Sequence, residues 1–193
     1  MTIEDITEQR NADQRVRSTE ERFRHAALAI SAERDPAKVL HAVLVSARAT
    51  LGAEYAAVAR YAEDGQTITD WEVDGLDANE LLERIGRHPV GIGVLGLASK
   101  LGTPVRLRDV QSHPASVGFP DGHPLMTSFI AVAIPHVGPG RATLYLANKR
   151  DSEEFSEGDE AIAVALATHA AVCLENARVN ARASELVRDL DRA

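Results

Sequence analysis

The spacing of apolar residues at the start of the chain predicts one long helix. Residues 1–33 contain no Gly or Pro, and Val16, Phe23 and Ile30 recur every seven positions among Glu, Arg and Gln. A seven-residue repeat places these side chains on one narrow side of a helix. We therefore expect a helix that ends near Arg34 and carries an apolar seam.

A second helix is marked by Asp35 and Pro36 at its start and Gly52 at its end. Asp is a favourable N-cap, Pro fits the first helical turn, and Gly often follows the last turn. Between these positions, apolar residues with helical spacing predict a stripe that faces a core. The stripe consists of Val39, Leu40, Val43, Leu44 and Ala47.

Short β-prone runs in the middle of the chain predict a sheet. A Glu-Asp-Gly turn separates the first two runs, and a Gly-Pro-Gly turn separates the last two, so each pair predicts a hairpin. The expected strands are Tyr55–Tyr61, Thr67–Val73, Pro104–Leu107, Ile130–Val137 and Ala142–Asn148. Helical spacing over Asn79–Ile85 and Val94–Leu101 predicts two short helices between the second and third strands.

The last helix is expected to begin near Glu157, with Ser156 as its cap and Glu160 in its first turn. Apolar positions then alternate in steps of four and three, which is typical of a coiled coil with one polar core position. These positions are Val172, Asn176, Val179, Ala183, Leu186 and Leu190. We expect them to join two copies of the chain in a homodimer; the alternative is a packing helix that frays after Arg178.

This order of elements predicts an α+β fold, with a central antiparallel β-sheet flanked by helices and long N- and C-terminal helices. The chain of 193 residues fits one domain with extensions. We expect an N-terminal dimerisation helix over residues 1–34, a globular domain over residues 35–178, and a C-terminal coiled-coil helix over residues 179–193.

Composition narrows the class of protein. With 45% hydrophobic and 26% charged residues, the chain resembles an ordinary globular protein, and we expect no membrane span, no signal peptide and a cytoplasmic location. A net charge of −8 argues against direct binding of nucleic acid. The single cysteine, Cys173, excludes an internal disulfide and argues against a thiolate metal site.

Candidate chemistry is concentrated in the loop over residues 113–126. His113 and His123 both precede a proline there, Met126 follows, and two apolar strands come next. A loop with ligand-capable side chains on a strand scaffold is a typical binding site. No Cys/His or Ser/His/Asp arrangement is evident, so we expect a binding domain and not an enzyme.

Several motifs resemble a GAF domain, the small-molecule sensing module of signalling proteins, over residues 35–178. Asn148-Lys149, then Phe155, then Asp159-Glu160 resembles the NK…F…DE signature of many GAF domains, including those that bind cyclic nucleotides. We interpret the Lys149–Asp159 pair as a structural clasp between a strand and the last helix, and we expect it to be a surface ion pair.

Within this family, residues 113–120, 123–126 and 144–146 resemble the haem-binding GAF domain of actinobacterial oxygen- and redox-sensing histidine kinases of the dormancy-response type. The resemblance implies haem b, with His123 as proximal iron ligand and Tyr145 as the distal tyrosine that hydrogen-bonds bound oxygen. His113 is the reserve ligand. The residues expected as pocket walls are Leu97, Met126, Phe129, Ile130 and Leu144.

The sequence departs from this subfamily by added methyl groups. Ala131 stands where a Gly is usual, and Ala142-Thr143 stands where Gly-Asn is usual. Larger side chains at these positions predict a narrower pocket.

The resemblance implies a cytoplasmic sensor module that binds haem and detects O₂, NO, CO or redox state for signal transduction, as in a two-component system. The end of the chain resembles a connector to a histidine-kinase or ANTAR output domain. Two alternatives stay open: a GAF domain that binds another small molecule, such as a cyclic nucleotide, and a ligand-free GAF domain that serves dimerisation or regulation.

Overall fold

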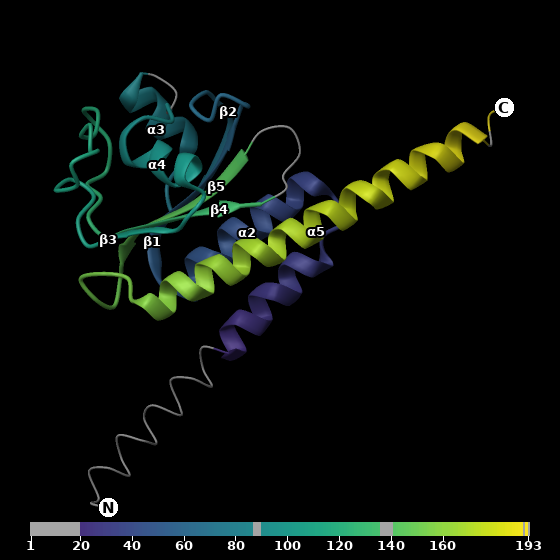
Figure 1. The fold of residues 1–193 in the computed structure, drawn as a ribbon, viewed down its shortest axis with the longest axis horizontal. Coiled ribbons are helices and arrows are strands. Elements are labelled where there is room, and N and C mark those ends of the chain that lie inside the picture. The colour runs from purple at the N-terminus through teal and green to yellow at the C-terminus, as the bar shows by residue number, and fades with distance from the viewer. Residues whose placement is uncertain (1–19, 87–89, 136–140, 191, 193) are drawn as a thin grey trace, which may run out of the picture.

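The computed structural model describes residues 20–86, 90–135, 141–190 and 192. Its centre is a five-stranded antiparallel sheet with the strand order β2-β1-β5-β4-β3 (Figure 1). The α+β class predicted from the sequence is confirmed. The strands are β1 (Ala53–Tyr61), β2 (Ile68–Asp74), β3 (Val105–Leu107), β4 (Phe129–Ile134) and β5 (Arg141–Lys149).

Strand β5 lies in the middle of the sheet and pairs with β1 on one side and β4 on the other. Its side chains alternate between two cores. Leu144 and Leu146 point to the core beneath the long helices, whereas Tyr145 and Ala147 belong to the core on the opposite face. This alternation is the period-two geometry of a strand, and burial on both faces explains the continuous apolar run.

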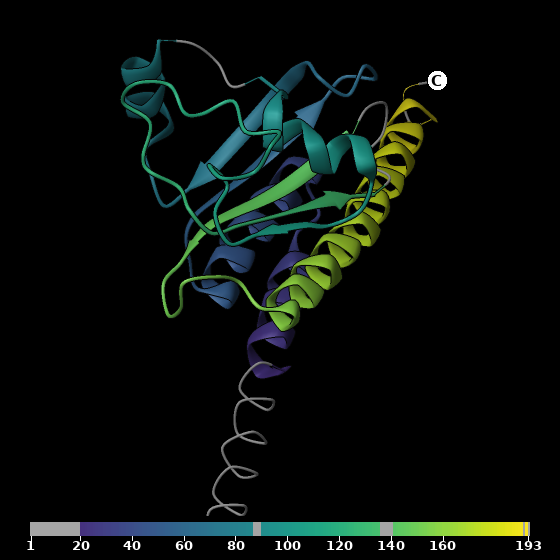
Figure 2. The same cartoon turned by 60° about the vertical axis from the view of Figure 1, so that its left-hand side comes forward.

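One face of the sheet is covered by α2 (Pro36–Leu51), by α5 (Glu157–Leu190) and by the helix over residues 20–32 (Figures 1 and 2). Helix α2 begins as predicted, because the Asp35 carboxylate accepts a hydrogen bond from the Ala37 amide at 3.0 Å. It ends at Gly52, which has a left-handed backbone with φ 60°.

The opposite face is covered by α3 (Ala78–Ile85), by α4 (Gly93–Leu101) and by the loop over residues 108–128. Figure 2 shows these segments on the side of the sheet away from α2 and α5. Two short helices and a loop cover less of the sheet than two long helices do, and the pocket described below lies on this side.

The N-terminal seam packs inside the protomer. Ile30 is fully buried and Phe23 is partly buried against the helical core, while Val16 lies outside the described residues. The imidazole Nε2 of His169 on α5 lies 3.1 Å from the carbonyl oxygen of Ala27, which ties this helix to α5. The seam therefore serves intrachain packing at these two positions.

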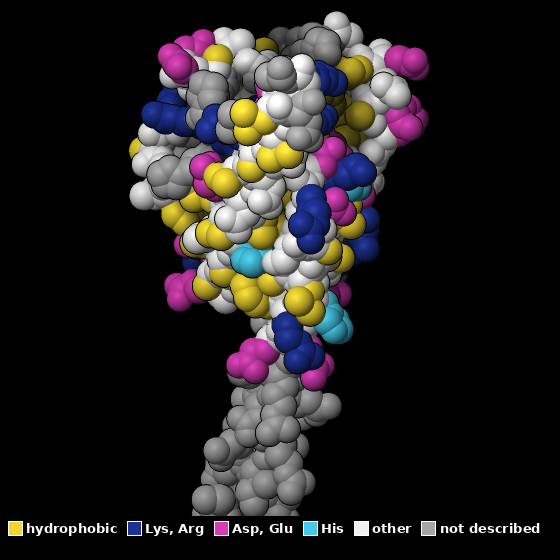
Figure 3. All heavy atoms as spheres, turned by 90° about the vertical axis from the view of Figure 1, so that its right-hand side faces the viewer, with side chains coloured by type: hydrophobic (Ala, Val, Ile, Leu, Met, Phe, Trp, Pro, Cys, Tyr) yellow, Lys and Arg dark blue, Asp and Glu magenta, His cyan; other side chains and the backbone are white. Residues whose placement is uncertain are grey.

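The C-terminal seam is exposed at Val172, Val179 and Leu190, while the side chain of Leu186 lies outside the described part. Helix α5 continues without a break through the predicted boundary at residue 178, and Val172, Val179 and Leu190 are 55%, 53% and 75% exposed. Figure 3, which looks toward the projecting end of α5, shows hydrophobic side chains gathered over the helical layer. A stripe of this kind is normally covered by a partner.

Among the described residues, α5 is the one helix long and apolar enough to cross a membrane by length and composition alone. One such helix does not establish a membrane span. The apolar character has another source here, because residues such as Leu166, Ala170 and Leu174 are buried against the rest of the domain. A core helix passes the same criterion as a membrane helix.

The Asn148-Lys149 signature forms the predicted clasp. The Lys149 ammonium donates to the Leu51 carbonyl oxygen at 2.8 Å and to the Asp159 carboxylate at 3.0 Å, and it lies 5.7 Å from the centre of the Phe155 ring. Both charged side chains are only 15% exposed, so this is a mostly buried pair and not the surface pair expected from the sequence.

We predict that Lys149→Ala lowers the free energy of unfolding by about 1–3 kcal/mol, because it removes charge-assisted hydrogen bonds and leaves Asp159 without its cation. The melting temperature should fall by roughly 2–12 °C. Calorimetry measures both quantities. Lys38→Ala, at an exposed position of α2, is the control and should change the melting temperature little; equal effects of the two substitutions would refute the clasp.

We also propose a parallel homodimer joined through α5. Light scattering at micromolar concentration should give the mass of a dimer for the wild type and the mass of a monomer for the double variant Val172→Glu/Val179→Glu, since charges on the seam oppose its burial. Val45→Glu, on the exposed side of α2, should remain dimeric. A monomeric wild type would contradict the proposal.

Candidate functional site

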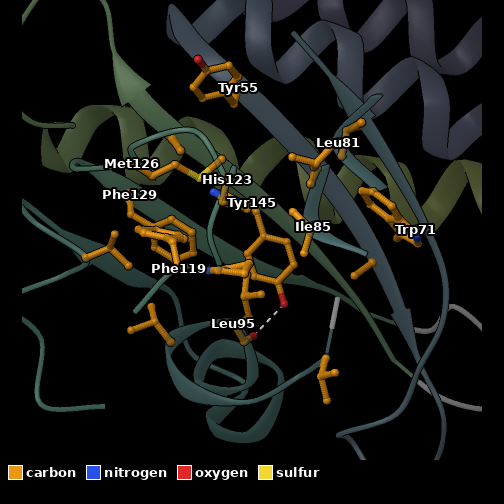
Figure 4. A pocket seen from close by; sticks show the side chains of 18 of the residues that line it. Tyr55, Trp71, Leu81, Ile85, Leu95, Phe119, His123, Met126, Phe129 and Tyr145 are labelled. Carbon is orange, nitrogen blue, oxygen red and sulfur yellow. Dashed lines mark hydrogen bonds between the residues drawn. The ribbon is translucent and has the colours of Figure 1, made fainter. Parts of the chain in front are cut away.

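A cavity of about 220 Å³ lies between the sheet and the layer of α3, α4 and the loop over residues 108–128. Its walls are mostly aliphatic and aromatic, and none of its described lining residues is Asp, Glu, Lys or Arg. The exposed residues Val90, Ile92 and Val117 mark its mouth. Figure 4 shows the labelled lining side chains Tyr55, Trp71, Leu81, Ile85, Leu95, Phe119, His123, Met126, Phe129 and Tyr145.

Two tyrosine hydroxyls meet at the α4 side of the cavity. The Tyr145 hydroxyl donates to the Leu95 carbonyl oxygen at 2.7 Å (Figure 4), and the Tyr61 hydroxyl lies 3.3 Å from the same oxygen. The two hydroxyls also form a hydrogen bond with each other. Tyr61 and Tyr145 are almost completely buried, so this network has little contact with solvent.

Both tyrosines are neutral at physiological pH. Burial raises the pKa of Tyr145 well above its ordinary value, and the neighbouring Tyr61 raises it further. Burial also raises the pKa of Tyr61. Each hydroxyl therefore keeps one proton to donate.

His123 lies in the loop on the side of the cavity next to Phe119 and Met126 (Figure 4). Its Nδ1 is 2.7 Å from the Pro124 carbonyl oxygen. A carbonyl only accepts, so the proton of the neutral ring is on Nδ1 and the lone pair is on Nε2. The ring stacks on Phe119 with centroids 4.7 Å apart and an interplanar angle of 16°. Nε2 has no hydrogen-bond partner within the described parts of the chain.

Asn148 holds the end of this loop against the sheet. Its side-chain oxygen accepts from the Thr127 amide at 2.9 Å, and its side-chain nitrogen donates to the Leu125 carbonyl at 3.0 Å and to Glu54 at 2.9 Å. The last bond lowers the pKa of the Glu54 carboxyl. Asn148 has φ 58°, a left-handed conformation that Asn tolerates better than most residues.

The structure brings together four of the six residues named as binding residues from the sequence: His123, Tyr145, Met126 and Phe129 all line the cavity. The other two do not. Leu144 lies on the opposite face of the sheet in the helical core, and Leu97 on α4 only packs beside the pocket-side core. These two positions correct the prediction, and strand alternation gives the physical reason for Leu144.

Ile130, a further expected wall, also faces the helical core. The reserve ligand His113 does not line the cavity, and its Nδ1 accepts a hydrogen bond from the Ala115 amide at 3.1 Å. It is therefore committed to the turn of its own loop.

The added methyl groups divide between the two faces. Ala131 is buried in the pocket-side core and pairs across the sheet with Tyr145, whereas Ala142 lies in the helical core. Thr143 is fully buried, and its hydroxyl lies near enough to Tyr145 to lower the pKa of that phenol, although the two do not meet the geometry of a full hydrogen bond. Only some of the departures therefore lie on the side of the cavity.

The sequence did not lead us to expect Tyr61 in the hydrogen-bond network of the site. The signal was available, because Tyr55, Ala57, Ala59 and Tyr61 alternate along β1 and therefore share a face of the sheet. What the sequence does not contain is the position of α4, which brings the Leu95 carbonyl to both hydroxyls.

Comparison with solved structures supports the fold. The GAF domain of a phosphoenolpyruvate-protein phosphotransferase from Coxiella burnetii is 22% identical, with a TM-score of 0.68 over 86% of this chain and 97% of that chain. The free methionine-R-sulfoxide reductase from Neisseria meningitidis, solved with its substrate, is 20% identical, with a TM-score of 0.65 over 84% of this chain and 91% of that chain.

A third similar structure is a far-red-absorbing protein in its dark state with bound biliverdin IXα. It is 13% identical, with a TM-score of 0.54 over 81% of this chain and 99% of that chain. At identities this low, the similarity shows a shared fold and nothing about ligand or activity.

The sequence itself settles the family. The model of the GAF domain family matches residues 33–175, which is most of the chain and includes the sheet, the cavity and the first half of α5. The chain therefore belongs to the GAF domain family, whose fold serves as a sensor and signalling module.

Proposed function

We propose that this GAF domain is a sensor module that binds haem b in the cavity, with His123 as the iron ligand. The observation that carries the proposal is the imidazole of His123, which lines an apolar cavity and whose Nδ1 proton is held by the Pro124 carbonyl. Metal-bound histidines commonly have this arrangement, because the carbonyl fixes the tautomer and orients the free Nε2 lone pair.

The residues present fit haem on the His123 side. Phe119 restricts rotation of the imidazole by stacking on it, and Met126 and Phe129 supply apolar walls. The cavity of about 220 Å³ is below the roughly 300–1,000 Å³ typical of ligand sites. A ligand of the size of haem would have to extend past the mouth at Val90 and Val117.

One structural neighbour supports a tetrapyrrole as the ligand. It holds biliverdin IXα, a linear tetrapyrrole, in a domain of the same fold. The iron of haem, when bound, supplies a coordination position for a diatomic gas such as O₂, NO or CO. The chain would contribute the imidazole of His123 to the iron, the apolar walls that limit access of water, and the hydroxyl of Tyr145 on the α4 side.

A second candidate ligand is a smaller, largely apolar organic molecule, which the volume of the cavity favours. A cyclic nucleotide is a poorer candidate, because its phosphate requires a cation or several amide donors and the described lining residues contain no Lys or Arg. The mostly buried Lys149 is occupied by the clasp.

The proposal assigns no catalytic activity to the domain. Cys173, the single cysteine, lies in the helical core on the face of the sheet opposite the cavity. We further propose a cytoplasmic protein that passes its signal through α5 to a histidine-kinase or ANTAR output domain, because α5 begins at the clasp and projects beyond the sheet (Figure 1).

The first prediction concerns haem uptake. Wild-type protein expressed with a haem precursor should show a Soret band with one haem per chain, and His123→Ala should lose stoichiometric haem while its far-UV circular dichroism stays unchanged. His113→Ala is the matched control and should retain the Soret band, since His113 does not line the cavity. A normal Soret band in His123→Ala would show that another residue is the ligand; absence of haem from the wild type would favour the smaller ligand.

The second prediction concerns Tyr145. Tyr145→Phe should keep haem and increase the rate of O₂ dissociation by roughly three- to tenfold, the factor that corresponds to one hydrogen bond. CO dissociation should change less, because CO is a weaker hydrogen-bond acceptor. Stopped-flow measurements with both gases test this, and equal changes for O₂ and CO would indicate a steric effect in place of a hydrogen bond.

A further inference from the structure

The two buried tyrosine hydroxyls share one carbonyl acceptor. Tyr61 and Tyr145 each carry one hydroxyl proton, and both hydroxyls lie within hydrogen-bond reach of the same Leu95 carbonyl oxygen. In an α-helix this carbonyl also accepts from the amide four residues further on, so one lone pair is left for a side chain. One tyrosine proton is therefore sufficient to satisfy the carbonyl.

In the structure, Tyr145 is the closer donor at 2.7 Å, and Tyr61 is at 3.3 Å. The hydrogen bond between the two hydroxyls takes up the second proton. A second arrangement satisfies the same carbonyl: Tyr61 donates to Leu95, and the Tyr145 proton is released toward the cavity. The exchange leaves no buried acceptor unpaired, which is the condition that usually makes such a change costly.

We propose that Tyr61 is a positioning residue that lets Tyr145 donate its proton to a bound ligand, by replacing Tyr145 at the Leu95 carbonyl. Tyr145 lines the cavity and Tyr61 does not, so only Tyr145 can reach a ligand directly. The inference deepens the proposed function and rests on it for the identity of the ligand. The ligand must carry an atom that accepts a hydrogen bond from Tyr145.

Close packing fixes the position of Tyr61. A Cβ atom on Gly91 would lie 2.3 Å from Cε1 of the Tyr61 ring, so glycine is needed there for the ring to occupy its place. A Cβ atom on Gly96 would lie 2.2 Å from the Gly91 carbonyl oxygen, so glycine is also needed at this position of α4 for the helix to pack against Gly91. The Tyr61 hydroxyl is thus held beside the Leu95 carbonyl and can replace Tyr145 without movement of its ring.

The exchange also distinguishes ligands. A ligand with a good acceptor atom, such as O₂, gains the Tyr145 hydrogen bond, whereas CO gains little from it. Without the Tyr61 hydroxyl, no other donor takes the place of Tyr145 at Leu95, so the release of Tyr145 to the ligand costs one hydrogen bond. Tyr61 therefore contributes to selectivity although it does not touch the ligand.

Gas kinetics on the haem-loaded protein provide the first test. Tyr61→Phe should increase O₂ dissociation by the same roughly three- to tenfold as Tyr145→Phe, with a small change for CO. The double variant Tyr61→Phe/Tyr145→Phe should match Tyr145→Phe alone, because both substitutions remove one hydrogen bond. An unchanged O₂ rate in Tyr61→Phe, or additive effects in the double variant, would overturn the proposal.

Proton exchange in the haem-free protein provides the second test and does not need the ligand. Nuclear magnetic resonance with labelled tyrosine should show two slowly exchanging hydroxyl protons in the wild type. In Tyr145→Phe the Tyr61 hydroxyl proton should remain slow, because it moves to Leu95. Exchange as fast as that of free tyrosine in this variant would overturn the replacement step.

The two tests separate this inference from the proposed function. If the wild type takes up no haem, the identity of the ligand is refuted, and the exchange measurement still decides whether Tyr61 replaces Tyr145. If haem is bound and His123 is its ligand, the kinetic measurement decides the role of Tyr61 on its own.

Discussion

The structure depends on one constraint, the burial of strand β5 on both faces. Every residue from Ala142 to Ala147 is buried, and successive side chains belong to different cores. Ala142, Leu144 and Leu146 pack in the core with α2 and α5, and Tyr145 and Ala147 line the cavity. A shift of register by one residue would exchange the two sets and place Tyr145 under the helices. Packing of the helical layer and placement of the pocket hydroxyl are therefore fixed by the same pairing.

The end of β5 extends this dependence to two distant segments. Asn148 binds the end of the loop that carries His123, and the adjacent Lys149 binds the start of α5. The two side chains are adjacent in sequence and yet contact different segments, so together they join the pocket loop to one helix. This explains why the signature is a dipeptide, and why its lysine can be structural while its asparagine lies close to the site.

Much of the fold was predictable, because its elements have strong local signals. The cap at Asp35, the stripe of α2, the two hairpins and the start of α5 all follow from residue spacing and turn chemistry, and the strands agree with the structure to within a few residues. The face of the sheet to which each strand residue points was harder to predict from the sequence. The Leu-Tyr-Leu motif predicts both Leu144 and Tyr145 in the pocket, but adjacent residues of a strand point to opposite faces of the sheet, and only Tyr145 is on the pocket side.

The interactions that required the structure are those between segments distant in sequence. Residues 20–32 pack against α5 within one chain, which no periodicity could distinguish from packing between chains. The contact of Tyr61 with Leu95 joins residues 34 apart and depends on where α4 lies. Burial of the Lys149–Asp159 pair likewise depends on Leu51 and Phe155, which come from two other segments.

The length of α5 has a mechanical consequence. Its 34 residues span about 50 Å at the usual rise per residue, and the clasp at Asp159 lies within its first turn. The helix is packed in the helical core as far as Ala177, so only the last part, about 20 Å long, projects from the domain. A tilt of about 5° of the whole helix against the sheet would move this free end by a few ångströms, and any such tilt must also shift the clasp, which adjoins the loop of the cavity through Asn148.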